Sequence, residues 1–317
     1  MSRRRVALPI LALASAGVLL AACAPQSSTT EPAASTAAAA ASSAPMESAT
    51  AAASAQPATP SASAAAALDE CSKENLPVLN PGTITIGTDS PAYPPYFVDD
   101  DPANGQGFES AVAYAVAKNL GFDTNEVSWV VVPFNKSYAP GAKDFDFDVN
   151  QISITPKRQK VVDFSDPYYT APQAVVALNK SKIANATTLA ELQGAKLGAQ
   201  VGTTSLDYIN DVVKPAEQPY VYNDTNDAKS ALNSGQIDGI VVDLPTALYI
   251  TAVEIDKSKV VGQFPGVGIG DQWGLLLQKD SPLTACIDKT LAAMTDSGEL
   301  QQIQDQWMGA DTAPIIE

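Results

Sequence analysis

Strand-like and helix-like segments alternate along most of the chain, and this alternation limits the folds that it can adopt. Residues 83–87 alternate in the manner of a strand, and residues 108–120 carry apolar side chains at helical spacing. A second series follows, from a strand pattern at 196–201 to a helical pattern at 283–294. Because strands that alternate with helices favour parallel sheets covered by helices, we expect an α/β fold over residues 71–308.

The segment before this region has a composition that does not support a folded core. Residues 24–68 consist almost wholly of Ala, Ser, Thr and Pro, and they contain no aromatic side chain. Such a segment buries too little apolar surface to offset the entropy lost on folding. We expect a flexible tether.

The first residues predict export. Three arginines at 3–5 precede an apolar stretch that is too short to span a membrane and ends in small residues, so we interpret residues 1–22 as a signal peptide. The Leu-Ala-Ala-Cys sequence at 20–23 resembles the lipobox of bacterial lipoproteins, in which Cys23 becomes the lipidated first residue. Residues 23–70 would then be a lipid-anchored linker on the outer face of the cell membrane. The alternative is a plain cleaved signal with an incidental cysteine.

The charge of the chain limits its partners. The formal net charge is −16, and it falls to about −19 once the three N-terminal arginines are removed. A protein this acidic repels nucleic acid and anionic lipid headgroups, so we expect no nucleic-acid partner. Attachment to a membrane would depend on the lipid rather than on basic side chains.

The cysteines and the absence of histidine constrain the chemistry further. If Cys23 carries lipid, Cys71 and Cys286 remain as a pair in an oxidising compartment, where a disulfide is expected; two unpaired thiols are the alternative. The chain has no histidine, and two thiols alone make a poor metal site. We therefore expect no metal ion, no cofactor and no histidine-based catalysis.

Two neighbouring motifs in the middle of the chain carry the strongest functional signal. Residues 152–158 read Ile-Ser-Ile-Thr-Pro-Lys-Arg, and residues 162–169 read Val-Asp-Phe-Ser-Asp-Pro-Tyr-Tyr. Together they closely resemble the signature of the polar amino-acid family of ABC-transporter solute-binding proteins. The surrounding frame agrees in order, with Gly-Thr-Asp at 87–89, Gly-Thr-Thr at 202–204 and Asp-Ser-Gly-Glu-Leu at 296–300.

This resemblance covers residues 83–308 and implies an architecture as well as a function. It implies the two-lobed periplasmic-binding-protein fold of type II, with mostly parallel sheets and two hinge strands. Lobe I would comprise residues 71–172 and 267–317, and lobe II residues 173–266. The protein would be the substrate-binding lipoprotein of an ABC importer, a monomer that captures a free polar amino acid and delivers it to a membrane permease. It would not be an enzyme.

Two charged residues are expected to bind the amino-acid backbone of the ligand. The resemblance assigns the α-carboxylate to Arg158, whose planar guanidinium can bind a carboxylate through two parallel donors. It assigns the α-ammonium to Asp243, which follows an apolar run at 240–242 and lies at a strand end. Taken alone, Arg158 would be interpreted as a surface residue after a turn, and Asp243 as a solvated loop residue or a helix cap.

Uncharged and aromatic residues complete the expected site. The resemblance implies hydrogen bonds from hydroxyl or backbone groups, an aromatic pair around the ligand's side chain, and polar contacts to that side chain or to the backbone. A glycine loop that opens a helix also presents free N–H groups to an anion. The alternatives are aromatic rings within the core and hydroxyls that cap local backbone. The expected residues are Ser153, Thr155, Thr203, Thr204, Tyr93, Phe134, Asp89 and Gln151.

Two other classes of protein share this fold. Periplasmic dehydratases act on carboxylated substrates, and Arg158 suits either class, but the obvious acid or base, Asp243, matches the ammonium site. Extracellular amino-acid sensors usually continue into a transmembrane helix and a signalling module, whereas this sequence ends at Glu317. We therefore favour the binding protein.

Overall fold

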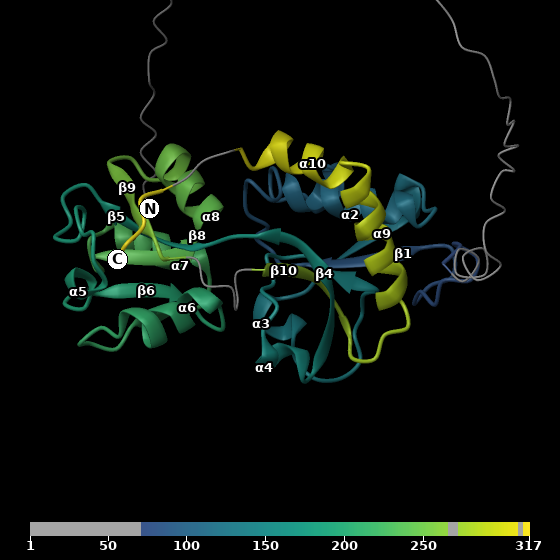
Figure 1. Ribbon diagram of the computed structural model, residues 1–317, viewed down its shortest axis with the longest axis horizontal. Helices are drawn as coiled ribbons and strands as arrows, with labels where there is room; N and C mark the ends of the chain where they lie inside the picture. Colours follow the sequence, from purple (N-terminus) through teal and green to yellow (C-terminus); the bar gives the residue numbers. More distant parts are fainter. Residues whose placement is uncertain (1–70, 266–271, 310–312) are drawn as a thin grey trace, which may run out of the picture. The chain divides into compact units, whose positions relative to one another are not determined.

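The computed structural model describes residues 71–265, 272–309 and 313–317 (Figure 1). All of these residues belong to one compact unit, Ala58–Glu317. The expected signal peptide, Cys23 and the linker lie outside the described residues. Within the described ranges, no helix is long and apolar enough to cross a membrane.

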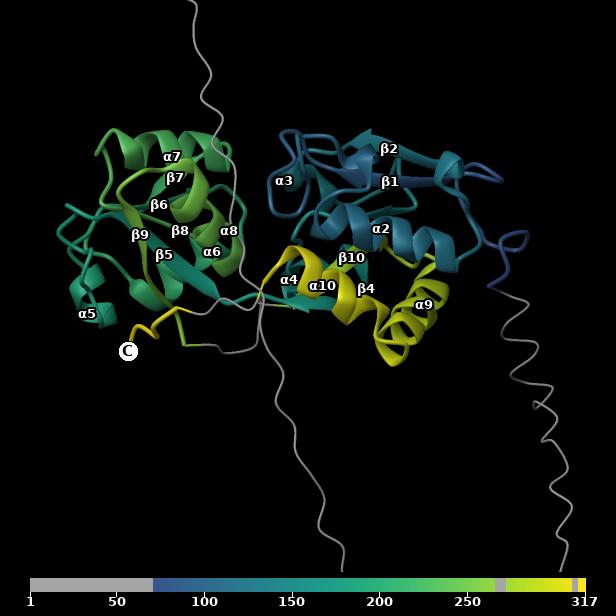
Figure 2. The same ribbon diagram turned by 90° about the horizontal axis from the view of Figure 1, so that it is seen from above.

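The first sheet has the strand order β2-β1-β3-β10-β4. Strand β1 is parallel to β2 and β3, whereas β10 is antiparallel to β3 and β4. Helices α2, α9 and α10 pack against one another beside this sheet (Figures 1 and 2). The strands are β1 (Ile84–Thr88), β2 (Val127–Val131), β3 (Phe147–Asp148), β4 (Val162–Thr170) and β10 (Gln272–Gln278). The helical elements are η1 (Pro102–Asn104), α2 (Phe108–Asn119), η2 (Thr124–Glu126), α3 (Phe134–Ser137), α4 (Pro156–Gln159), α9 (Thr284–Asp296) and α10 (Glu299–Trp307).

The second sheet has the strand order β7-β6-β8-β5-β9. Strand β6 is parallel to β7 and β8, whereas β5 is antiparallel to β8 and β9. The strands are β5 (Gln173–Leu178), β6 (Leu197–Gln200), β7 (Tyr220–Tyr222), β8 (Gly239–Asp243) and β9 (Ser258–Gln263). The helical elements are α5 (Leu189–Leu192), α6 (Thr204–Tyr208), η3 (Ile209–Val213), α7 (Thr225–Asn233), α8 (Leu244–Tyr249) and η4 (Ile250–Glu254).

Each sheet with its helices forms one lobe of an α/β fold. Both sheets are mixed rather than mostly parallel, because each contains strands on which the chain enters or leaves the lobe. The chain passes directly from β4 of the first sheet to β5 of the second. It returns between β9 and β10, and that return includes residues outside the described ranges.

The end of the chain departs from the expected lobe assignment. Lobe I was expected to include residues 267–317, but the last five residues pack on the second sheet. Ile315 pairs in parallel with Gln263 of the edge strand β9, and Ile316 is only 1% exposed within the second core. An edge strand has unpaired backbone groups, and this short segment satisfies some of them. The assignment of residues 313–317 to lobe I was therefore wrong.

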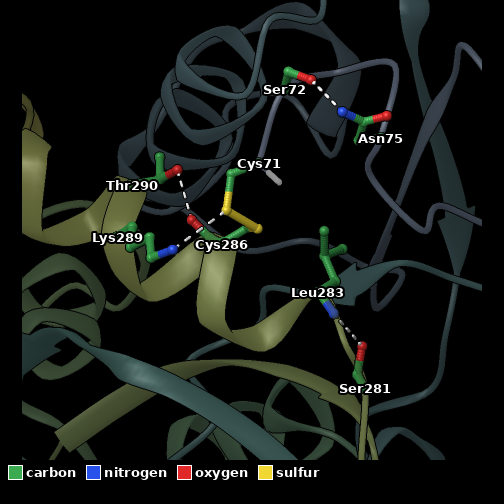
Figure 3. The surroundings of a disulfide bond; sticks show 8 residues. All are labelled: Cys71, Ser72, Asn75, Ser281, Leu283, Cys286, Lys289 and Thr290. Atoms are coloured by element: carbon green, nitrogen blue, oxygen red, sulfur yellow. Dashed lines mark hydrogen bonds between the residues drawn. A yellow bond between two sulfur atoms is a disulfide. The ribbon is translucent and has the colours of Figure 1, made fainter. Parts of the chain in front are cut away.

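A disulfide joins the start of the described chain to helix α9 (Figure 3). Cys71 and Cys286 are bonded with a Cα–Cα distance of 5.5 Å, so the expected pair is confirmed and the alternative of two free thiols is excluded. Thr290 donates to the carbonyl oxygen of Cys286 over 2.9 Å, and the ammonium of Lys289 lies 3.9 Å from the sulfur of Cys71. The bond closes a sequence separation of 215 residues.

Candidate functional site

One cavity is lined by side chains from both lobes. Its wall includes residues that directly follow β1 and residues that end β6 and β8, and these are the strand ends at which open α/β sheets bind ligands. Eight of the ten residues expected from the sequence line it. They are Asp89, Tyr93, Phe134, Gln151, Ser153, Thr203, Thr204 and Asp243.

Asp243 is held at the cavity by a short chain of hydrogen bonds. It is the last residue of β8, and the side-chain amide of Gln173 donates to its Oδ1 over 2.5 Å. Gln173 is completely buried, and its own amide oxygen accepts a hydrogen bond from the hydroxyl of Ser205 over 2.6 Å. This chain fixes the direction of a carboxylate at the cavity wall, where it can pair with a cationic group.

Arg158 lies behind the cavity wall rather than in it. Its guanidinium is buried and donates to the carbonyl oxygens of Ser153, over 2.7 Å, and Gly202, over 3.0 Å. It also stacks on the rings of Tyr138 and Phe134, at 4.6 and 5.4 Å from their centroids. Burial lowers the pKa of this group, and the neighbouring Tyr138 opposes the change.

The loop at Gly202 has no room for a side chain. Its φ of +76° is in the left-handed region, and a Cβ atom there would lie 2.2 Å from the hydroxyl oxygen of Tyr138. That hydroxyl instead donates to the Gly202 carbonyl over 3.3 Å. The glycine therefore allows two side chains of the first lobe, Arg158 and Tyr138, to reach the backbone of the second.

The hydroxyl residues have different positions. Ser153 and Thr204 both line the cavity, and their hydroxyl oxygens lie 3.1 Å apart across the two lobes. Thr203 caps α6 by accepting from the backbone N–H of Leu206. Thr155 does not line this cavity; its hydroxyl caps α4 by accepting from the backbone N–H of Arg158 over 3.2 Å. Its hydroxyl thus has the local capping role that the sequence left open.

Asp89 and Tyr93 of the first lobe also line the cavity. Both carboxylate oxygens of Asp89 accept backbone hydrogen bonds, from Ser90 over 2.7 Å and from Phe134 over 3.0 Å. Burial raises the pKa of Asp89 in spite of these donors. The ammonium of Lys229, from α7 of the other lobe, lies 5.2 Å from the centroid of the Tyr93 ring.

A match to a family model establishes the family of the chain. Residues 84–310 match the model of the bacterial extracellular solute-binding proteins, family 3. The chain belongs to this family. The family resemblance that the motifs suggested is therefore confirmed, and this solute-binding protein belongs to an extracytoplasmic class.

Individual relatives of this solute-binding protein agree with that membership. It is 30% identical over 233 residues to the L-cystine-binding protein TcyJ of Escherichia coli, and the matched region covers 73% of this chain and 84% of TcyJ. It is 28% identical over 229 residues to the arginine-binding extracellular protein ArtP of Bacillus subtilis, with coverages of 71% and 85%. A solved structure, an ancestral arginine-binding protein bound to arginine, is 31% identical with a TM-score of 0.61 and coverages of 72% and 99%. The two-lobed α/β fold is confirmed.

Sequence patterns missed several residues of the solute-binding protein's cavity. Gln200 ends β6, and its side-chain oxygen accepts from the hydroxyl of Thr225 over 2.9 Å. Thr246 bonds the hydroxyl of Tyr96 across the lobes over 2.8 Å. Gln200 could have been found from its position at the end of a strand pattern. Thr225 and Thr246 belong to helix starts that face the cavity only because of the tertiary fold, so no local signal marks them.

Proposed function

We propose that this solute-binding protein holds a free polar amino acid in the cavity between its lobes and delivers it to the permease of an ABC importer. The observation that carries the proposal is the placement of Asp243: a carboxylate, oriented by the buried Gln173, at a cavity that is also lined by Ser153, whose carbonyl oxygen accepts from Arg158. The two opposite charges match the two charges of an amino-acid backbone. Family membership and the names of the relatives support this assignment.

In this proposal, Arg158 binds the α-carboxylate after it gives up a backbone partner. Its N–H groups donate to two carbonyl oxygens, and a carboxylate is a stronger acceptor than either because the hydrogen bond is then charge-assisted. The rings of Phe134 and Tyr138 exclude water from the guanidinium and so strengthen its attraction for an anion. Ser153 and Thr204 add hydroxyl groups from the two lobes.

Binding is coupled to the approach of the lobes. Arg158 and Ser153 belong to the first lobe, and Asp243 and Thr204 belong to the second. A ligand that contacts all of them binds the closed form better than an open one, and it therefore shifts the population toward closure. The closed form would be the state that a permease recognises.

Two substitutions test the assignment of the charges. Asp243→Asn keeps the shape of the side chain but removes its charge, and Arg158→Ala removes the guanidinium; each should weaken binding by about 100-fold or more. A thermal-shift screen of the common amino acids identifies the ligand, because a ligand that binds only the folded form raises the melting temperature. Isothermal titration then gives the affinities.

Matched controls separate the site from the rest of the surface. Lys157→Ala removes the exposed cation next to Arg158, and Asp238→Asn removes a carboxylate just before β8; neither residue lines the cavity. Both variants should bind as the wild type does. Unchanged affinity in Asp243→Asn would overturn the proposal. Mass spectrometry that recovers the ligand unaltered distinguishes a binder from a dehydratase-like enzyme.

We further propose that Cys23 carries lipid and anchors a monomer to the outer face of the membrane. The Leu-Ala-Ala-Cys sequence and the polar linker that follows it support this. Radiolabelled palmitate should enter the wild-type protein but not Cys23→Ser, which should be recovered from the soluble fraction. Palmitate labelling of Cys23→Ser at the wild-type level would refute the anchor.

A further inference from the structure

A completely buried carboxylate, Glu109, lies directly behind the cavity wall. It is in the first turn of α2 and has no exposed surface. It accepts hydrogen bonds from the phenol of Tyr168, from the backbone N–H of Gln151 over 2.7 Å and from the side-chain amide of Gln151. Two of its three bonds therefore hold one residue, and that residue lines the cavity.

Gln151 has a backbone conformation that needs such support. Its φ is +47°, in the left-handed region that residues other than glycine seldom adopt. Conformations of this kind persist where the surroundings over-determine them, and they cluster at functional sites. Here Glu109 binds Gln151 at both its backbone and its side chain, so a single carboxylate sets the backbone and the direction of the amide.

We propose that Glu109 is a positioning residue that fixes Gln151 so that the amide oxygen of Gln151 is presented to a donor group of the bound amino acid. The inference rests on the proposed function of the cavity. The amide nitrogen is directed at Glu109, so the oxygen is the end of the amide that is turned away from Glu109 and can accept from the ligand. Glu109 itself does not contact the ligand.

The hydrogen bonds around Glu109 favour its ionised form. All three are donated to it, and a carboxylate is an acceptor only; a proton on Oε2 would face the donor N–H of the Gln151 amide. Burial raises the pKa of Glu109 to about 7, although the bonds from Tyr168 and Gln151 lower it. The other ionisable groups near it are Tyr168 of β4, Tyr96 before α2 and Asp148 of β3, and burial raises the pKa of each of these as well.

Affinity and stability should therefore respond to pH in opposite directions. As the pH falls through about 7, Glu109 takes up a proton, Gln151 loses its support, and ligand affinity falls. The pKa of Glu109 in the unfolded chain is lower, so the folded protein binds more protons between the two values. Protonation of Glu109 therefore makes the folded state more stable as the pH falls. If Glu109 had only a structural role, ligand affinity would not fall over the same pH range.

The test is Glu109→Gln in the full mature protein, titrated with L-arginine, L-cystine and L-glutamine. Wild-type affinity should fall about tenfold between about pH 8 and about pH 6, since a hydrogen bond to a charged group is lost. The variant should bind about tenfold more weakly than the wild type at about pH 8, with no further loss at about pH 6. Asp148→Asn, which removes another completely buried carboxylate of this lobe but does not touch Gln151, should keep the wild-type pH profile.

A second measurement tests the proposal even if the Glu109→Gln variant does not fold or if none of the three amino acids binds. In wild-type protein, the NMR signals of the Gln151 side-chain amide should shift with pH with the same midpoint as the Glu109 carboxyl carbon. If neither signal titrates, or if Glu109→Gln keeps the wild-type affinity and pH profile, the positioning role is wrong. If no amino acid binds the wild type at any pH, the proposed function fails, while the NMR titration still decides whether Glu109 controls Gln151.

Discussion

The two lobes have the same strand topology but are stabilised by different means. The core of the first lobe is aromatic: the ring centroid of Trp273 lies 4.9 Å from that of Tyr169 and 5.5 Å from that of Tyr96. The core of the second is aliphatic, with Val176 and Ile240 completely buried on neighbouring strands. The first lobe has a disulfide across it, whereas the second is joined by a β-bridge to the terminal segment, residues 313–317.

This difference corresponds to a difference in their parts of the site. Behind the cavity, the first lobe buries polar groups such as Glu109 and Arg158, and it needs a rigid frame to hold them in place. The second lobe contributes Asp243 and Thr204 at strand and helix ends. If the second lobe moves as a rigid unit on closure, Asp243 and Thr204 move with it. The buried partners of Asp243, Gln173 and Ser205, carry no charge, so the lobe that buries charged side chains is the one with the disulfide.

Removal of the disulfide should give the largest change in stability, and it should affect the first lobe. In Cys71→Ser with Cys286→Ser, a loop of 215 residues is no longer closed in the unfolded chain. The chain-entropy model gives roughly 5 kcal/mol as an upper value, and typical losses are about 2–4 kcal/mol. Urea unfolding, followed by tryptophan fluorescence for the first lobe, measures the change. An unchanged midpoint would mean that the aromatic core alone stabilises this lobe.

Loss of a contact of the terminal segment should have the next largest effect, and only on the stability of the second lobe. Ile316→Ala removes a buried side chain from an aliphatic core, which costs about 2 kcal/mol or more. Ile315→Ala is the matched control, because Ile315 is 56% exposed and should change stability by less than about 0.5 kcal/mol. Hydrogen exchange at the backbone of β9 should quicken in the first variant and not in the second.

Gly262 allows a check on this prediction. A Cβ atom at position 262 would lie 2.6 Å from Cγ1 of Ile316 and 2.7 Å from the carbonyl oxygen of Pro314. Gly262→Ala should therefore displace the terminal segment and lower the free energy of unfolding by about 1 kcal/mol. In a chain shortened by residues 313–317, the same substitution should cost nothing. An equal loss of stability in both chains would show that the terminal segment is not what excludes a side chain at position 262.

Sequence patterns predicted the α/β class and the disulfide, because each depends on local periodicity or residue type. The family resemblance implied eight of the residues that line the cavity. The position of the terminal segment was not predictable in this way, because five residues are too few to show a periodic pattern. The segment packs against Gly262, where a side chain would collide with Ile316 and Pro314. The stacking of Arg158 on Tyr138, and its bond to Gly202, depend on the approach of two segments distant in sequence. The role of Glu109 depends likewise on the left-handed backbone of Gln151.

The smallest expected effect concerns a contact between the lobes. Lys229 of the second lobe lies over the ring of Tyr93 in the first and also pairs with Glu254 at 2.7 Å. Lys229→Gln removes both contacts, whereas Glu254→Gln removes only the ion pair. If the cation–ring contact stabilises closure by about 0.5–1 kcal/mol, Lys229→Gln should weaken ligand binding about two- to fivefold. Glu254→Gln should bind as the wild type does. Isothermal titration compares the three proteins; equal losses in both variants would place the effect in the second lobe itself, and not in the contact between the lobes.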